Sequence, residues 1–401
     1  MEPLKLLLVG CGMMGARHLR GLGELERVAP GTVRLAALCD VRREYAEKVA
    51  AEASELLGYV PQVFTDLEEA IGGKVALDAV DLVTDPRSHD ELVVRLVQAG
   101  LHVLCEKPLA VTVARGQRMI EAAAEAGRVL AVAENNRRDP MNRLAKACLE
   151  AGLIGTPHLA IQTQISAGGG ILATAWRHRL AMGGILLDVP IHSGYALEML
   201  LGPLESVVAQ AQLVQSQRSG KEFDGKEVEV VADAPDCLCA LLQFASGTQG
   251  HWLSHYASAG ETAYRRLILG SEGTLGQSGD RSGRPVVLKR GREELTPEAL
   301  LAVLPDYQLN AIETKLFGER PTSYTLEGPV TDRKLLAAEI HDFAEAVRLG
   351  RAPEVDGATG LRAVAILHAM LESSLASRRV TVAEVLSGQT HAYQDRVEAA
   401  Q

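Results

Sequence analysis

The stretch LLLVGCGMMGARH, residues 6–18, runs from an apolar segment through a glycine-rich loop into a helical pattern. Gly10, Gly12 and Gly15 have the spacing G-x-G-x-x-G, and Met13 and Met14 lie within the same loop. Between a strand and a helix, such glycines permit a tight turn and the close approach of a pyrophosphate, which the free N–H groups of the helix can bind. The stretch therefore predicts a dinucleotide-binding turn, and a purely structural turn is the alternative.

Asp40 supports dinucleotide binding, because it ends the second apolar segment, 25 residues after Gly15. A carboxylate at this place accepts hydrogen bonds from the ribose of an adenosine and repels the 2′-phosphate of NADP. We therefore expect the cofactor to be NAD. Arg42 and Arg43 follow closely and weaken this preference, so NADP remains an alternative.

The first third of the chain alternates short apolar runs with segments whose apolar residues recur at three- or four-residue spacing. This alternation is typical of βαβ units. It predicts an α/β domain with a doubly wound parallel sheet over residues 1–135. The expected strands are residues 4–9, 33–39, 79–83, 103–105 and 129–133.

After about residue 136 the pattern changes to runs separated by Gly, Ser and Asp, in several of which polar and apolar residues alternate. Such runs are typical of antiparallel strands, so residues 136–401 are predicted to form an α+β domain. The expected strands lie in HLAIQTQIS, SVVAQAQLV, CLCALLQFA, TQGHWLSHY and RRLILG, and the expected helices in residues 142–150, 185–200, 335–349 and 359–377.

Composition excludes several classes of protein. The 401-residue chain has a formal net charge of −10 and no basic stripe, which argues against nucleic acid as a partner. Its first residues lack a secretory signal, and no uninterrupted apolar stretch reaches the roughly 18 residues of a membrane span. Six scattered cysteines, without a CxxC pair or histidines at metal-ligand spacing, predict buried reduced thiols in a cytoplasmic protein and no metal site.

The stretch HVLCEKPLA, residues 102–110, ends an apolar run in Glu106 and Lys107. In an open parallel sheet, residues just after a strand project into the crevice where ligands bind. Pro108 biases Lys107 toward an extended backbone, so the amine should leave the strand in a fixed direction. These two residues are candidates for a site, and an ordinary surface ion pair is the alternative.

The stretch MGGILLDVPIHSGYALEMLLG, residues 182–202, carries Asp188 and His192 four positions apart. This spacing places both on one face of a helix whose other positions are mostly apolar. Proline is tolerated in a first helical turn, so Pro190 predicts that the helix begins close to Asp188, which can act as its N-cap. The alternative is a capping aspartate with a histidine that is hydrogen-bonded inside the core.

Taken together, these pieces resemble the Gfo/Idh/MocA oxidoreductase family, over nearly the whole chain. The resemblance rests on the glycine loop with His18 after it, and on the glycine-containing segment that ends in Asp-x-x-x-His. It also rests on DPRSHDELVVRLVQAGLHVLCEKPLAV, NNRRDP, WRHRLAMGGILLDVPIH and EIHDFAEAVRLGRAPEVDGATGL. The sequence departs from the family pattern at Pro190, Tyr195 and Met182, positions that face or flank the substrate.

The resemblance implies a Rossmann domain followed by a domain with a large, mostly antiparallel open sheet. It implies that Lys107, Asp188 and His192 meet beside the nicotinamide. His89 and Glu106 match positions that line the nicotinamide and its ribose. Asn135 and Arg137 match an element at the domain junction, where we expect them to contact the cofactor and the substrate, respectively.

The resulting hypothesis is an NAD(P)-dependent dehydrogenase for a secondary alcohol of a sugar, sugar derivative or cyclitol. His192 is the expected general base, since an unperturbed imidazole titrates at about 6.5, and Lys107 would stabilise the developing alkoxide. Asp188 would orient the imidazole or bind a substrate hydroxyl. Trp176 and Arg177 would contact a polyhydroxylated ring.

Two rival hypotheses use the same fold. One is an enzyme that retains NAD and cleaves or eliminates glycosides by transient oxidation. The other is a non-catalytic sensor that binds NAD. A large sheet with one exposed face also predicts a homodimer or homotetramer through the second domain.

Overall fold

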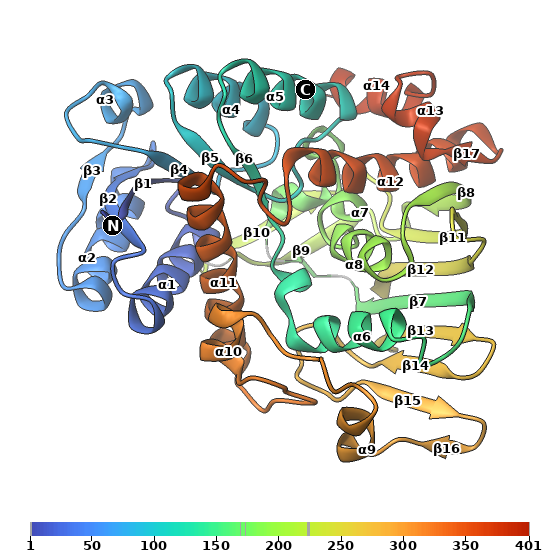
Figure 1. Ribbon diagram of the computed structural model, residues 1–401. Coiled ribbons are helices and arrows are strands. Elements are labelled where there is room, and N and C mark those ends of the chain that lie inside the picture. Colours follow the sequence, from blue (N-terminus) through green and yellow to red (C-terminus); the bar gives the residue numbers. More distant parts are fainter. Residues whose placement is uncertain (1, 169, 173, 223–224, 401) are drawn as a thin grey trace.

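The computed structural model describes residues 2–168, 170–172, 174–222 and 225–400. Within them, residues 4–133 form a six-stranded parallel sheet in the order β3-β2-β1-β4-β5-β6. Helices lie between its strands (Figure 1). The strands are β1 (Leu4–Val9), β2 (Val33–Cys39), β3 (Gln62–Phe64), β4 (Ala79–Leu82), β5 (His102–Glu106) and β6 (Leu130–Ala133). The helices are α1 (Met13–Val28), α2 (Arg43–Leu57), α3 (Leu67–Ile71), α4 (His89–Gln98) and α5 (Val113–Glu125).

This sheet confirms the predicted doubly wound fold. The strand order reverses between β1 and β4, and ligands bind at such a switch point, beyond the carboxyl ends of the strands. The glycine loop follows β1 and therefore lies there. The prediction missed β3, which has three residues at the edge of the sheet.

The second half of the chain contains a nine-stranded sheet, counted over the described residues, in the order β16-β15-β14-β13-β7-β12-β11-β8-β17. It is mostly antiparallel, as expected, and the pair β7 and β12 runs parallel. Its strands are β7 (Pro157–Ala167), β8 (Leu204–Gln212), β11 (Cys237–Phe244), β12 (Gln249–Ser258), β13 (Ala263–Gly270), β14 (Thr274–Gln277), β15 (Val287–Arg290), β16 (Glu293–Glu294) and β17 (Val380–Thr381).

A separate hairpin of β9 (Gln217–Lys221) and β10 (Glu227–Val231) was not predicted. The remaining elements are helical. They are η1 (Asn135–Arg138), α6 (Pro140–Glu150), η2 (Ala175–His178), η3 (Leu180–Met182), α7 (Ile185–Asp188), α8 (Ile191–Leu201), α9 (Pro297–Ala302), α10 (Ala311–Phe317), α11 (Gly328–Leu349), α12 (Gly357–Ala376), α13 (Val382–Leu386) and α14 (Ala392–Ala399).

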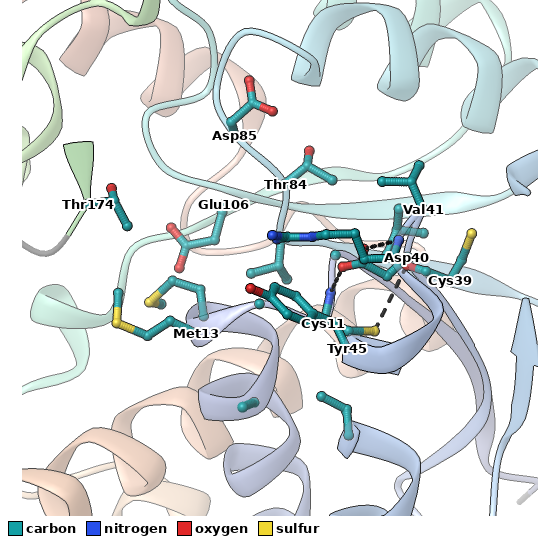
Figure 2. A pocket seen from close by; sticks show the side chains of 18 of the residues that line it. Cys11, Met13, Cys39, Asp40, Val41, Tyr45, Thr84, Asp85, Glu106 and Thr174 are labelled. Atoms are coloured by element: carbon teal, nitrogen blue, oxygen red, sulfur yellow. Dashed lines mark hydrogen bonds between the residues drawn. The ribbon is translucent and has the colours of Figure 1, made fainter. Parts of the chain in front are cut away.

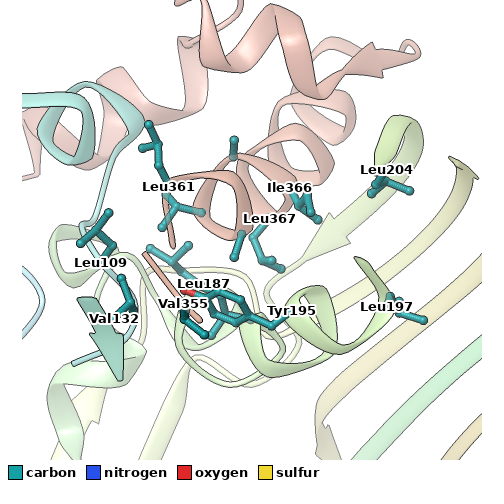
Figure 3. Close-up of a cluster of buried hydrophobic side chains, with 14 of the residues drawn as sticks. Leu109, Val132, Leu187, Tyr195, Leu197, Leu204, Val355, Leu361, Ile366 and Leu367 are labelled. Carbon is teal, nitrogen blue, oxygen red and sulfur yellow. The ribbon is translucent and has the colours of Figure 1, made fainter. Parts of the chain in front are cut away.

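The two late helices α11 and α12 return to the first sheet. Helix α11 packs along α1, and α12 packs against α5 on one side and β8 on the other (Figure 1). Side chains of α12, such as Leu361 and Leu367, belong to one buried cluster with Val132 of β6 and Tyr195 of α8 (Figure 3). A Cβ on Gly360 would lie 2.5 Å from Cγ2 of Val132, so the helix requires a glycine at this contact. The packing fixes the two halves against each other at the site.

The segment that carries Asp188 and His192 differs from the prediction of one helix. Helix α7 ends at Asp188 and α8 begins at Ile191, with Pro190 as the N-cap residue of α8 and no side-chain cap. Asp188 is therefore the last residue of α7 and not the N-cap of a longer helix. Because Pro190 has no N–H group to donate, the hydrogen-bond ladder is interrupted at this position.

Among the described residues, no single helix has the length and apolar composition to cross a membrane, and one bent pair, Leu180–Asp188 with Ile191–Leu201, meets the criteria together. The six cysteines are free thiols. Five are buried as expected, and Cys239 is exposed because it faces outward from β11.

Candidate active site

A cleft of about 610 Å³ lies beyond the carboxyl ends of the first sheet and continues to the second domain. Its size is that of a small-molecule or cofactor site. Figure 2 shows Asp40 and Tyr45 toward one end of the cleft, and Met13, Glu106 and Thr174 toward the other. The predicted residues that line it are Gly10, Gly12, Met13, Met14, Asp40, Arg42, Glu106, Lys107, Trp176, Arg177 and Asp188. The predicted residues that do not line it are Gly15, His89, Asn135, Arg137 and His192.

The glycine loop has the shape that a pyrophosphate requires. Gly10 has φ +93°, and a Cβ there would lie 2.5 Å from the backbone oxygen of Val83. A Cβ on Gly15 would lie 2.1 Å from the backbone oxygen of Gly10, so Gly15 permits the close packing of α1. A Cβ on Gly12 would meet no protein atom within 4 Å and would project into open space. The first turn of α1 carries no acidic residue, so the loop fits the diphosphate of a dinucleotide.

Asp40 shapes the far end of the cleft. Its Oδ2 accepts a hydrogen bond from the backbone N–H of Cys11 at 2.7 Å, and its Oδ1 accepts one from that of Arg42 at 2.8 Å. The guanidinium of Arg42 lies 3.6 Å above the ring centre of Tyr45. A carboxylate has about four lone-pair sites, so Asp40 keeps acceptor capacity for a ribose while it holds the glycine loop.

Glu106 ends β5 and belongs to a buried row of charges. His18 donates from Nε2 to Glu106 Oε1 at 3.2 Å and from Nδ1 to Asp81 Oδ2 at 2.9 Å. Burial alone would lower the pKa of His18, but the two carboxylates outweigh it and raise this pKa well above its usual value. The imidazolium in turn holds the pKa of Glu106 below its usual value, against the effect of burial. The other oxygen of Glu106, Oε2, accepts the backbone N–H of Lys107 at 2.8 Å, so the row fixes the start of the Lys107 loop.

Lys107 and Asp188 meet between the two domains. The Lys107 amine donates to Oδ1 of Asp188 at 3.0 Å and to its backbone oxygen at 2.9 Å. Arg177 donates from Nε to Oδ2 of Asp188 at 2.6 Å. Burial would raise the pKa of Asp188, but Lys107 and Arg177 hold it well below its usual value. The site therefore contains a carboxylate with two cations, all lining the cleft.

His192 lies in the first turn of α8 with its side chain 17% exposed. Its Nδ1 donates to Oε2 of Glu134 at 2.7 Å, and Glu134 is fully buried at the end of β6. The prediction that Asp188 orients this imidazole is wrong for the structure, because both Asp188 oxygens bind cations and the hydrogen-bond partner of His192 is Glu134. The two residues also lie on separate helices rather than on one helix face.

Three other predicted residues lie behind the cleft. His89 is fully buried, and its ring nitrogens face the backbone oxygens of Pro108, Leu109 and Thr84, at 3.1 to 3.3 Å. Asn135 is buried in η1. Arg137 lies 3.6 Å from Glu354, near the junction of the two halves.

The substrate end of the cleft is formed by η2 and its surroundings. The guanidinium of Arg177 lies 4.3 Å above the ring of Trp176, so one face of this indole is already covered. Thr174 and Glu222 also line this end and were not predicted. Among the described residues, no group of three or more His, Cys, Asp and Glu side chains has an arrangement that could hold a metal ion.

The sequence reasoning missed Glu134, Tyr45 and Asp81. Glu134 carries the same signal as Glu106, since it directly follows an apolar run that was predicted as a strand. Tyr45 lies in α2, soon after Asp40, and its contact with Arg42 has no signature in the sequence. Asp81 lies inside β4, where the pattern predicts an apolar core residue.

Comparisons with known proteins identify the family of the chain. Residues 4–134 match the NAD-binding Rossmann fold of an oxidoreductase family, and residues 146–382 match the C-terminal alpha/beta domain of the same family, GFO_IDH_MocA. The chain is 27% identical over 384 residues to myo-inositol 2-dehydrogenase of Thermotoga maritima, covering 96% of this chain and 100% of the relative. It is 27% identical over 292 residues to levoglucosan dehydrogenase of Pseudarthrobacter phenanthrenivorans, covering 69% and 73%.

Among solved structures, an NAD-binding oxidoreductase from Klebsiella pneumoniae superposes with a TM-score of 0.77 at 27% identity, over 95% of this chain and 99% of that one. The two matched ranges cover most of the chain. The first half of the chain is an NAD-binding Rossmann domain, and the chain belongs to the Gfo/Idh/MocA family of oxidoreductases.

Proposed function

We propose that the protein is an NAD-dependent dehydrogenase that oxidises a secondary alcohol of a sugar, sugar derivative or cyclitol, or reduces the corresponding ketone. The observation that carries the proposal is the contact of Lys107 with Asp188 in the cleft that begins at the glycine loop. It brings a cation and a carboxylate from the two halves to the end of the cleft opposite Asp40. His192 lies four positions beyond Asp188 in the chain.

The residues divide the chemistry between them. Lys107 donates a hydrogen bond to the reacting hydroxyl and stabilises negative charge on its oxygen as the proton leaves. His192 accepts this proton at Nε2, because its Nδ1 is occupied by Glu134. Asp188 holds Lys107 and Arg177 in place. Bound NAD supplies the acceptor for the hydride in oxidation, or NADH the donor in reduction.

The substrate class follows from the groups around Lys107. Arg177 offers donors, Glu222 and Asp188 offer carboxylate oxygens, and Thr174 offers a hydroxyl that both donates and accepts. A mixture of donors and acceptors suits a ring whose hydroxyls are themselves both. The curated relatives act, by their names, on myo-inositol and levoglucosan, which are polyhydroxylated rings. We also propose that Arg137, at the junction of the two domains, contacts such a ring.

Formation of NADH at 340 nm, with a panel of inositols, hexoses and anhydrosugars, tests the proposal. We expect a member of the panel to support turnover in the wild type. His192→Ala should lower kcat by a factor on the order of 100 or more, while the Kd of NAD changes little. The proposal fails if no member is oxidised, or if His192→Ala turns over at the wild-type rate.

Two further measurements separate the rivals: titration of the protein with NAD, and chromatography of the products from a glycoside incubated without added cofactor. Tight NAD binding with no turnover of any polyol or glycoside would favour a sensor. Cleavage of a glycoside without added NAD and without net NADH would favour an enzyme that retains its cofactor. We further propose a cytoplasmic protein, which the free thiols support.

A homodimer or homotetramer through the second sheet is also proposed. Val208 of β8 and Leu241 of β11 are 41% and 60% exposed and lie opposite each other in the register of these two strands. An apolar pair on an open sheet face favours contact with a second copy. Sedimentation of the purified protein as a 42.9 kDa monomer would contradict this.

A further inference from the structure

We propose that Glu134 is the positioning residue for the base His192, fixing its ring and the nitrogen that carries the proton. The kinetic test of this role rests on the proposed function. The position of the proton on the His192 ring can be observed by spectroscopy whether or not a substrate is known.

The environment of Glu134 points to this role. The side chain is completely buried, and Oε1 accepts the backbone N–H of Asn136 at 2.8 Å. Among the described residues, no lysine or arginine lies within ion-pair distance of Glu134, and its Oε2 is 2.7 Å from Nδ1 of His192. A buried carboxylate is costly unless it is paired. The imidazole is therefore the main partner of this charge.

The consequence for His192 follows from the chemistry of imidazole. A neutral ring carries one proton, on Nδ1 or on Nε2, and the hydrogen bond at one nitrogen decides which. Glu134 has only acceptor oxygens when ionised, so it selects the form with the proton on Nδ1. The lone pair on Nε2 then faces away from Glu134 and can accept the proton of a substrate.

Glu134 also links the His192 ring of the second domain to the first domain. Glu134 directly follows β6 of the first sheet, whereas His192 lies in the first turn of α8 in the second domain. Helix α8 starts afresh after the break at Pro190, so its first turn is not held by a continuous helix. A 2.7 Å contact to a rigid strand end fixes that turn relative to the cofactor domain.

Burial disfavours the charged forms of Tyr195 and Glu339, two acids near Glu134. Burial, and then the charge of Glu134, raise the pKa of Tyr195 on α8 well above its usual value. Burial raises the pKa of Glu339 on α11 well above its usual value, with Glu106 and Glu134 adding to it and His18 and Arg138 opposing it. Arg137 of η1 is the nearby cation that acts on Tyr195. Glu134, by contrast, has the imidazole of His192 as an ion-pair partner.

The kinetic test compares Glu134→Gln with Glu372→Gln. Glu372 is a matched control, because it is also buried and accepts backbone N–H groups, from Tyr393 and Gln394, far along the chain from the cleft. Glu134→Gln should lower kcat for alcohol oxidation by on the order of 10- to 100-fold, with little change in KM or in the Kd of NAD. Its pH–rate profile should differ from that of the wild type, because an amide carries no charge to pair with the ring. Glu372→Gln should change neither.

A measurement on the wild type keeps the proposal testable if Glu134→Gln does not fold or if no substrate is found. Nitrogen-15 NMR of protein with labelled histidines, with the His192 signals assigned by their loss in His192→Asn, reports which nitrogen is protonated. We expect the neutral ring to carry its proton on Nδ1, beside Glu134. A neutral ring with the proton on Nε2, or a Glu134→Gln variant with wild-type kcat and pH profile, would overturn the assignment.

Discussion

The amine of Lys107 lies 3.0 Å from Oδ1 of Asp188, although the two residues are 81 positions apart and come from the two domains. Both residues line the cleft, and Arg177 donates to the other oxygen of Asp188. Asp188 therefore binds the two cations, Lys107 and Arg177, whereas Glu134 is hydrogen-bonded to the imidazole of His192. Two carboxylates thus hold the two groups that are proposed to act on the substrate oxygen.

Lys107→Met tests the role of the amine. The variant keeps the length of the side chain but removes its charge, so we expect kcat to fall by on the order of 100-fold or more. Asp188 keeps Arg177 as a partner, so the loss of folding stability should stay within about 1–3 kcal/mol. Steady-state kinetics and thermal unfolding measure both. Lys146→Met, at an exposed i,i+4 pair with Glu150, is the control and should leave both unchanged. Near wild-type kcat in Lys107→Met would contradict the role.

Gly12→Ala tests the cofactor loop. A Cβ here meets no protein atom and no unusual φ, so the variant should fold with an unchanged Tm. The methyl group projects into open space beside the N-terminus of α1, where the pyrophosphate is expected, so the Kd of NAD should rise on the order of tenfold. Titration of the protein with NAD measures this. Gly260→Ala, which also has open space, is the control. Unchanged NAD binding in Gly12→Ala would place the pyrophosphate elsewhere.

Asp40→Asn tests the preference for NAD over NADP. Loss of the negative charge removes the repulsion of a 2′-phosphate, and Arg42 remains beside it. We expect the ratio of the two Kd values to move toward NADP by on the order of tenfold, which corresponds to about 1.4 kcal/mol. Asp66→Asn is the control, because Asp66 caps α3 outside the cleft and asparagine caps a helix equally well. A ratio that is the same in Asp40→Asn and the wild type would contradict the assignment.

The buried row Asp81–His18–Glu106 predicts how stability depends on pH. His18 has a pKa raised above its unfolded value of 6.5, so its contribution is complete below that pH and is lost as pH rises through the folded-state pKa. Glu106 has a pKa lowered from 4.5, so its contribution is complete above that pH and is lost as pH falls through the folded-state value. The row therefore makes its full contribution to the stability of the folded protein between pH 4.5 and pH 6.5. Chemical unfolding across pH measures it.

His18→Gln should remove the alkaline decline and lower stability by about 3–5 kcal/mol near pH 6, because Asp81 is left buried without a charged partner. His391→Gln is the control, because His391 forms an exposed pair with Asp395. It should lower the free energy of unfolding far less than His18→Gln does. Parallel stability profiles for His18→Gln and the wild type above pH 6.5 would contradict the charge on His18.

The parts of this molecule that follow from local pattern could be predicted from the sequence. The bounds of β1 and β2 match the expected strands, because both are continuous apolar runs between clear breaks. The glycine loop and Asp40 follow from a fixed spacing. The helix break at Pro190 was missed, since a proline is equally compatible with the first turn of a single helix. The polar hairpin of β9 and β10 has no buried face strong enough to mark it.

Contacts between distant segments could not be predicted in the same way. Glu134 follows a predicted strand, yet nothing in the sequence pairs it with His192 on α8. The charged row through His18 depends on Asp81, a carboxylate inside a buried strand, which a hydrophobicity pattern assigns to the core. Asp188 was predicted as a site residue and lines the cleft, but its partners depend on how the two domains pack.

The central claim is that Lys107 and His192 act on one substrate oxygen. A crystal structure of the protein with NADH and a polyol that it oxidises tests this most directly. The account predicts that the Lys107 amine and Nε2 of His192 both lie about 2.6–3.2 Å from the same hydroxyl oxygen. A ring held with its reacting hydroxyl against Lys107 alone, and with Nε2 of His192 bonded to protein instead, would contradict it.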